Sequence, residues 1–399
     1  MFRPYIKRTS VLVVVAVINL FLVYVSYISY EFEPGSNYDV KIKSARIMRE
    51  ALDLTSSYSK QIIELTSDNY DRFDSGVIGV DSVSSPMTTK EGSLNSKVAT
   101  TNPNFSALFI ELLSEIDSSL VDVSIQDTIA VGYTGSFPGA NIALLSACKA
   151  VNIYPVIISS IGSSSWGANQ LDLTWLDIEK YLFRDFFDYK NYAISLGGDG
   201  DAAIELSSEV IVKLKNKIIS NNYNFIEAPS LESSINERMK IYHNASKSYK
   251  AYISIGGSAA SLGDSTTMKM YLPGINYQKD PEMVESIVNA LDEDLIDMDI
   301  DTIVPVTEKF IEEVNIPVIN IRNINNLCTW YGLPYYDEDY NGLDMEIGSG
   351  ELFGDRTAHH KLVVWLCLIL SFLMLIWIVI SSIAQVNKKM KEIHNEPVE

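Results

Sequence analysis

Four turns rich in glycine and serine hold the groups with the clearest chemical potential. Each turn follows a short apolar segment and precedes a helical pattern. Glycine lets a backbone approach a ligand, serine adds a hydroxyl, and a helix N-terminus offers unpaired N–H groups, so such turns bind phosphate or carboxylate. One such turn is explained by a tight strand-to-helix connection, but four together favour a binding site. The candidate ligand-binding residues there are Gly135, Ser136, Gly139, Ser163, Ser164, Gly197, Gly198, Asp199, Gly200, Asp201, Gly256, Gly257 and Ser258.

Five side chains in or near these turns are candidates for catalysis, with no assignment among them. They are Ser136, Ser258, Asp199, Asp201 and Lys97. Lys97 lies earlier, in a segment rich in Ser and Thr, and is a candidate both for the base of a Ser-Lys arrangement and for a cation that binds an anionic ligand. The alternative for Lys97 is an exposed loop lysine.

The better-known motifs are missing around the other candidates. Ser136 lacks the G-x-S-x-G elbow, and His243 lies within a predicted helix and is expected at the surface, which disfavours a Ser-His-Asp triad. Asp199 and Asp201 have the chemistry for proton transfer or for binding a divalent cation, but Asp before a helix is more often an N-cap. No metal site is assigned.

The sequence carries no nucleotide-binding motif. The first turn reads GYTGSFPG over residues 132–139, which is not G-x-G-x-x-G, and no Walker pattern occurs. The cofactor is therefore unknown, with a divalent cation as an alternative.

Strands and helices that alternate must position these turns. Apolar strands are expected at residues 128–133, 155–161, 192–196, 224–228, 251–255 and 316–321. Such βαβ units predict an α/β fold with a mainly parallel, doubly wound, Rossmann-like sheet, whose strand C-terminal ends line a ligand crevice.

Helical signals accompany the strands. Residues 40–68 form a predicted stalk or packing helix, and Asn104 is expected to cap a helix over residues 105–120. Ser234 and Glu237 have the spacing of a capping box. Residues 81–103 are rich in Ser and Thr and are predicted to be a loop.

Two uncharged apolar runs, residues 11–29 and 362–383, are each long enough to cross a hydrocarbon core of about 30 Å. The alternatives are a cleaved signal peptide for the first and a buried core helix for the second. Lysine and arginine lie before the first run and after the second, which predicts a cell-membrane protein with both ends in the cytoplasm and the main domain outside. The expected segments are 1–30 (tail and span), 31–127 (juxtamembrane helix, loop and helix), 128–345 (α/β domain), 346–361 (linker), 362–384 (span) and 385–399 (tail).

The charge is concentrated between the two runs. The chain has a formal net charge of −20, whereas residues 31–360 hold 48 acidic and 24 basic residues, a net charge of −24. This balance excludes a general nucleic-acid binder, which needs a basic face. Cys148 and Cys328 could pair outside the membrane, but their apolar surroundings are typical of free core cysteines.

Several stretches resemble the poly-gamma-glutamate system protein family of bacteria. They are VGYTGSFPGANIALLSACKA, IGSSSWGANQ with LDLTWLDIE, ISLGGDGD and SIGGSAASLG, together with SPMTT and TTNPNF in the earlier segment. The N-terminal anchor matches as well, and the resemblance covers most of residues 80–275. It brings no established active-site residue.

The resemblance implies a membrane component of a system that makes or exports poly-gamma-glutamate, a polymer with one free carboxylate per residue. The expected function is that the extracytoplasmic domain handles the emerging polymer alongside other membrane subunits. The alternative is an extracytoplasmic hydrolase or transferase that acts on gamma-amide bonds of a cell-envelope polymer. A domain of net charge −24 repels a polyanion, so binding needs local donors such as the glycine turns and Lys97, or a bridging divalent cation.

Overall fold

The computed structural model describes residues 9–66, 71, 73–290, 303–335 and 341–394. The chain divides into two compact units, one made of Met1–Ser36 with Gly354–Glu399 and the other of Asn37–Phe353. The first unit contains both apolar runs, and the second contains the four glycine-rich turns.

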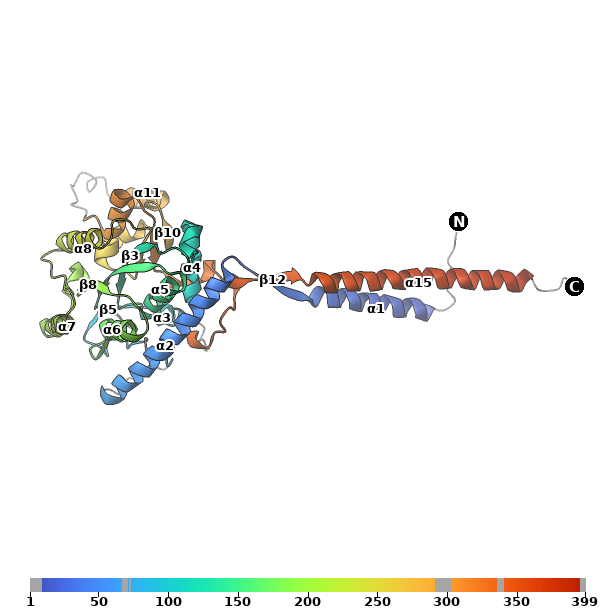
Figure 1. Cartoon of the computed structure of the whole chain (residues 1–399), viewed down its shortest axis with the longest axis horizontal. Helices are drawn as coiled ribbons and strands as arrows, with labels where there is room; N and C mark the ends of the chain where they lie inside the picture. The colour runs from blue at the N-terminus through green and yellow to red at the C-terminus, as the bar shows by residue number, and fades with distance from the viewer. Residues whose placement is uncertain (1–8, 67–70, 72, 291–302, 336–340, 395–399) are drawn as a thin grey trace. The chain divides into compact units, whose positions relative to one another are not determined.

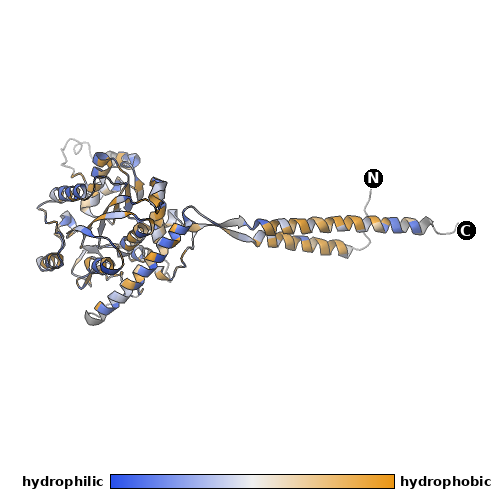
Figure 2. Cartoon of the chain, viewed as in Figure 1, coloured by the Kyte–Doolittle hydropathy of each residue, from blue (hydrophilic) through white to orange (hydrophobic). Residues whose placement is uncertain are grey.

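The first unit pairs the two ends of the chain. Helices α1 (Thr9–Ile28) and α15 (Lys361–His394) pack together, and strand β1 (Tyr30–Pro34) lies antiparallel to β12 (Gly354–His359). Within the helices, Ser371 donates a hydrogen bond to Asn19. Both helices contain candidate membrane spans, Ser10–Ile28 and Lys361–Lys388, whose side chains are almost all exposed and apolar (Figure 2). This arrangement is consistent with membrane association.

The second unit is built on a mostly parallel sheet of six strands. Its spatial order is β10-β11-β9-β3-β4-β8, and only the β10–β11 pair is antiparallel. The chain runs outward from β3 through β4 to β8 and then returns to β9 and β11 on the other side of β3, so the strand order reverses between β3 and β9. The strands are β3 (Thr128–Thr134), β4 (Tyr154–Ser160), β8 (Asn191–Ser195), β9 (Tyr252–Ile255), β10 (Gly274–Asn276) and β11 (Val318–Ile321).

Helices cover both faces of this sheet, as near-continuous apolar strands require. Alternate residues of β3 show the two faces: Ile129 and Val131 pack with α2, α4 and α5, whereas Ala130 packs with α8. Figure 1 shows α2, α4 and α5 to one side of β3 and α8 to the other. The prediction of an α/β fold with a mostly parallel sheet is confirmed. These four helices are α2 (Tyr38–Thr66), α4 (Phe105–Ile116), α5 (Pro138–Val151) and α8 (Leu231–Ala245). The unit also contains α6 (Trp175–Asp185) and α7 (Ser208–Ser220).

Short elements complete the second unit. The additional strands are β2 (Thr88–Lys90), β5 (Ser163–Ser164), β6 (Asn169–Gln170) and β7 (Leu173–Thr174). The additional helices are α3 (Leu94–Ala99), α9 (Ala259–Leu262), α10 (Ser265–Lys269), α11 (Pro281–Ala290), α13 (Val306–Lys309) and α14 (Ile324–Trp330).

Three local predictions are wrong. Residues 81–103 are not a simple loop, because they contain β2 and α3. Asn104 makes no side-chain cap for α4; its amide instead bonds the backbone of Glu346 and Gly348. The cap of α8 is Ser230, whose hydroxyl accepts from the Ser233 N–H, while Ser234 lies inside the helix.

Two further predictions can be placed. The expected strand at residues 224–228 is reduced to a single parallel bridge between Phe225 and Ile194. Cys148 and Cys328 are free and buried.

Candidate functional site

Lys97 is the most unusual candidate side chain, because it is a fully buried lysine. It lies in α3, a short helix that begins after Ser93, whose hydroxyl accepts a hydrogen bond from the Ser96 N–H. Val98 and Ala99 in the same helix are also buried, so the last turn of α3 is held inside the protein. Lys97 itself is 1% exposed, which rules out the alternative of an exposed loop lysine.

The Lys97 ammonium contacts a serine and an aromatic ring. Its Nζ lies 3.0 Å from Ser164 Oγ and 3.4 Å from the centroid of the Phe137 ring. Among the ion pairs of the described residues, none joins Lys97 to a carboxylate. Burial without such a partner lowers the pKa of Lys97 from 10.5 to about 7. A large fraction of Lys97 is therefore a neutral amine near pH 7, able to accept the proton of a hydroxyl.

Ser164 is positioned by two strand ends. It lies in β5, which pairs in parallel with β2, so that the segment carrying Lys97 is attached to the turn after β4. The Ser164 N–H donates to Ser136 Oγ at 3.0 Å, and the Ser163 hydroxyl donates to the Gly135 carbonyl at 3.0 Å. The predicted turns after β3 and β4 thus meet at the C-terminal edge of the sheet, with Lys97 behind them.

Two glycines allow this close approach. A Cβ on Gly92 would lie 2.9 Å from Ser164 Oγ and 2.7 Å from the Ser165 carbonyl. A Cβ on Gly139 would lie 2.6 Å from the Thr100 carbonyl, so the start of α5 and the end of α3 can only touch here without a side chain. Gly139, a predicted ligand-binding residue, therefore has a packing role.

Asp201 and Asp199 do not form a carboxylate pair. Asp201 is buried in an ion pair with Arg238 at 2.8 Å, and it accepts from the Ser195 hydroxyl at 2.7 Å. Asp199 is exposed, and its N–H donates to the Glu205 carboxylate. Within the described residues, no group of three or more His, Cys, Asp or Glu is placed to hold a metal ion.

By the dyad we mean Ser164 and Lys97; of the remaining predicted residues, Gly256 and Gly197 lie next to residues close to it. A Cβ on Gly256, in the turn after β9, would lie 3.7 Å from the Phe137 ring, and one on Gly197, after β8, would lie 3.7 Å from Gly162. Gly197, Gly198 and Gly200 all have positive φ, which the tight GGDGD turn requires. Gly257 is exposed and Ser258 half-buried, and no hydrogen bond from the Ser258 side chain caps α9.

Two features of the site escaped sequence reasoning. The first is the serine of the dyad: the sequence predicts Ser136 and Ser258 as catalytic candidates and Ser164 only as a ligand-binding residue, whereas Ser164 is the serine that contacts Lys97. Glu179 is a fully buried carboxylate bonded by Tyr133, Trp175 and Asn191. Burial raises the pKa of Glu179 to about 7. No sequence signal separates Ser164 from its serine neighbours; Glu179 sits in an ordinary amphipathic helix.

No protein-family model, no curated protein and no solved structure matches this chain.

Proposed function

We propose that this chain is a membrane-anchored component of a poly-gamma-glutamate synthesis or export system whose Rossmann-like domain lies outside the cytoplasm and cleaves or transfers gamma-amide bonds of the polymer. The observation that carries the chemical part is the 3.0 Å contact between Ser164 and the buried Lys97, which forms no ion pair with a carboxylate of the described residues. The two candidate spans support the anchoring, and the resemblance of the glycine-rich turns supports the polymer.

The dyad has the parts of a nucleophile and its general base. Neutral Lys97 accepts the Ser164 proton while Oγ attacks the carbonyl carbon of the amide. The C–N bond then breaks as the Lys97 ammonium returns a proton to the leaving nitrogen, which leaves an ester on Ser164. Water releases the acid in hydrolysis, and an amine takes the acyl group in transfer. Phe137 and the protein around Lys97 keep water from the amine, which maintains its low pKa.

Replacing Ser164 with Ala is expected to abolish turnover, because the nucleophile is removed, while the fold loses only the hydrogen bond with Lys97, about 1 kcal/mol. The full chain in detergent is incubated with poly-gamma-glutamate of defined length, and chain length and released amines are measured. We expect activity to fall by at least about 10³-fold, the scale of losing a nucleophile.

The matched control is Ser96→Ala, at the position before Lys97. Within the described residues, the Ser96 hydroxyl forms a hydrogen bond with Tyr335 and with no other group. This variant should retain turnover within about twofold. Equal activity of the wild type and Ser164→Ala would contradict the catalytic proposal. A lack of activity in the wild type itself would contradict it as well.

The proposed topology predicts opposite labelling of two introduced cysteines. Val83 is 96% exposed in the domain, and Lys391 is exposed near the end of α15. In right-side-out membrane vesicles, an impermeant maleimide should label Val83→Cys at once and Lys391→Cys only after the membrane is opened. The native cysteines are buried and give little background. The reverse pattern would place the domain in the cytoplasm.

A further inference from the structure

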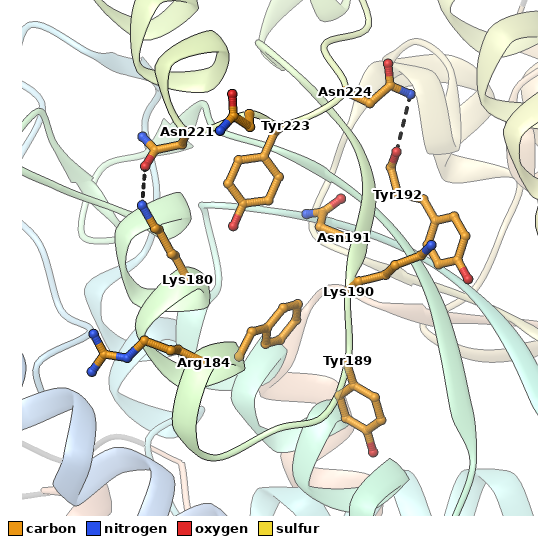
Figure 3. Close-up of a pocket in the computed structure, with 11 residues that line it drawn as sticks. Lys180, Arg184, Tyr189, Lys190, Asn191, Tyr192, Asn221, Tyr223 and Asn224 are labelled. Carbon is orange, nitrogen blue, oxygen red and sulfur yellow. Dashed lines mark hydrogen bonds between the residues drawn. The ribbon is translucent and has the colours of Figure 1, made fainter.

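A cavity lies at the opposite end of the sheet strands from Ser164. Its volume is about 550 Å³, and its walls come from the second half of α6, the start of β8 and residues 221–224 (Figure 3). β8 begins at Asn191, and residues 221–224 lead into Phe225, which bridges in parallel to Ile194. The cavity therefore opens where the parallel strands begin, whereas the dyad lies where they end.

The walls of this cavity carry positive charge in an otherwise acidic domain. Among the described residues that line the cavity are Lys180, Arg184 and Lys190, and none of these lining residues is acidic. Arg184 is already paired with Asp185 at 2.5 Å, and its guanidinium points away from Lys190 (Figure 3). Within the ion pairs of the described residues, neither Lys180 nor Lys190 has a carboxylate partner. Two ammonium groups are thus available to an anionic ligand.

The two lysines lie on opposite sides of the cavity, with polar and aromatic groups between them. Lys180 donates to the Asn221 side chain at 2.6 Å, and the Lys190 ammonium lies 4.4 Å from the centroid of the Tyr192 ring. The Tyr223 ring stands between Lys180 and Asn191, and its hydroxyl points into the cavity (Figure 3). This hydroxyl is a donor placed between two separate cations.

The Asn191 side chain in the cavity wall is held by three hydrogen bonds. Its side-chain amide donates to Ser159 at 2.6 Å and to Glu179 at 2.8 Å, and its carbonyl oxygen accepts from the Ala193 N–H. Asn191 therefore separates the cavity from the buried Glu179 carboxylate. The raised pKa of Glu179, about 7, limits the negative charge that an anionic ligand would meet behind this wall.

Separated cations suit a ligand whose charges are also separated. A compact phosphate gathers several donors at one point, often at a helix N-terminus, whereas here the cations are apart and aromatic rings lie between them. Carboxylates on methylene arms can reach both lysines while the methylenes pack against the rings. We propose that this cavity binds a flexible, amide-linked acidic chain, with one carboxylate at Lys180, another at Lys190 and the Tyr223 hydroxyl donating between them. The cavity would hold the chain at a place separate from the dyad.

Binding of glutamate oligomers tests this inference independently of catalysis. The full-length Ser164→Ala protein, which cannot consume the ligand, is titrated with gamma-linked and alpha-linked hexaglutamate at 0.1 M salt. Either oligomer should bind, and the preferred linkage identifies the source as the polymer or as an acidic peptide. Lys180→Gln with Lys190→Gln should raise Kd at least tenfold, and Tyr223→Phe about threefold.

The matched control removes the same two charges elsewhere. Lys247 and Lys269 are exposed and form no ion pair within the described residues, so Lys247→Gln with Lys269→Gln should change Kd less than twofold. Equal weakening by both pairs would show nonspecific attraction and overturn the site. Unchanged binding in the Lys180/Lys190 variant, tighter binding of inorganic phosphate or oligogalacturonate, or equal binding of neutral hexaglutamine would overturn it as well. These outcomes do not depend on turnover by the wild type. The binding proposal for the cavity and the catalytic proposal for the dyad can therefore be contradicted separately.

Discussion

Lys97→Met is expected to stabilise the domain at pH 7 while abolishing turnover. Within the described residues the buried ammonium has no carboxylate partner, and its pKa of about 7 instead of 10.5 means that the folded state disfavours the charged form. Methionine has a similar shape and no charge, so the free-energy cost of burying the ammonium disappears. The loss of the hydrogen bond to Ser164 offsets about 1 kcal/mol of this gain. We expect a gain on the order of 2 to 4 kcal/mol in the free energy of unfolding at pH 7.

The burial of Lys97 also makes the free energy of unfolding depend on pH. Between pH 7 and 10.5 the unfolded chain keeps a proton on Lys97 that the folded chain has lost, so wild-type stability rises with pH in that window. Lys97→Met should lack this rise, and thermal unfolding of the detergent-solubilised chain at pH 7 and pH 10 measures it. Lys97→Arg, which stays charged, should be less stable than wild type at both pH values.

An exposed lysine provides the control for this series. Lys247→Met changes the same groups at the surface and should leave both stability and its pH dependence nearly unchanged. A Lys97→Met protein that unfolds earlier than wild type at pH 7 would show that the ammonium is stabilising. One that is more stable but still active would show that Lys97 is not the base.

The sheet was the most predictable part of the fold. Five expected strands appear within one or two residues, because buried parallel strands are continuous apolar runs that the sequence shows directly. The expected strand at residues 224–228 is longer than the observed single bridge, because a short apolar run does not indicate how many of its residues pair with a neighbouring strand. The antiparallel β10 was missed because its three residues, Gly274–Asn276, carry no alternating pattern.

The site was predictable only in outline. The glycine turns after β3 and β4 do meet, as parallel topology requires, and Lys97 was among the named candidates. Its burial could not be foreseen, because Ser and Thr around it suggest a solvated loop, whereas their hydroxyls are satisfied locally: Thr100 and Thr101 bond the carbonyls of Lys97 and Val98. The serine that Lys97 contacts depends on the β2–β5 pairing, two short strands distant in sequence.

Asp201→Asn is expected to lower the free energy of unfolding by about 3 to 5 kcal/mol, the scale of breaking a buried ion pair from one side. Arg238 and Asp201 are 3% and 1% exposed, and their contact joins α8 to the turn after β8. The amide oxygen of this variant can still accept a hydrogen bond from the guanidinium, as the Ser195 hydroxyl does, but neither group carries a charge, so Arg238 is left buried without a counter-ion. Chemical unfolding followed by tryptophan fluorescence measures the change, because Trp175 is buried in this domain.

Asp199 provides the control that distinguishes a structural role of Asp201 from a catalytic one. Asp199→Asn, two residues earlier and exposed, should change stability by no more than about 0.5 kcal/mol. Asp201→Leu combined with Arg238→Met should recover much of the lost stability, because no unpaired charge then remains buried. If that double variant also retains turnover of the polymer, Asp201 serves the fold alone. If Asp201→Asn stays as stable as wild type and loses turnover, Asp201 belongs to the chemistry and the ion pair is not what holds this turn.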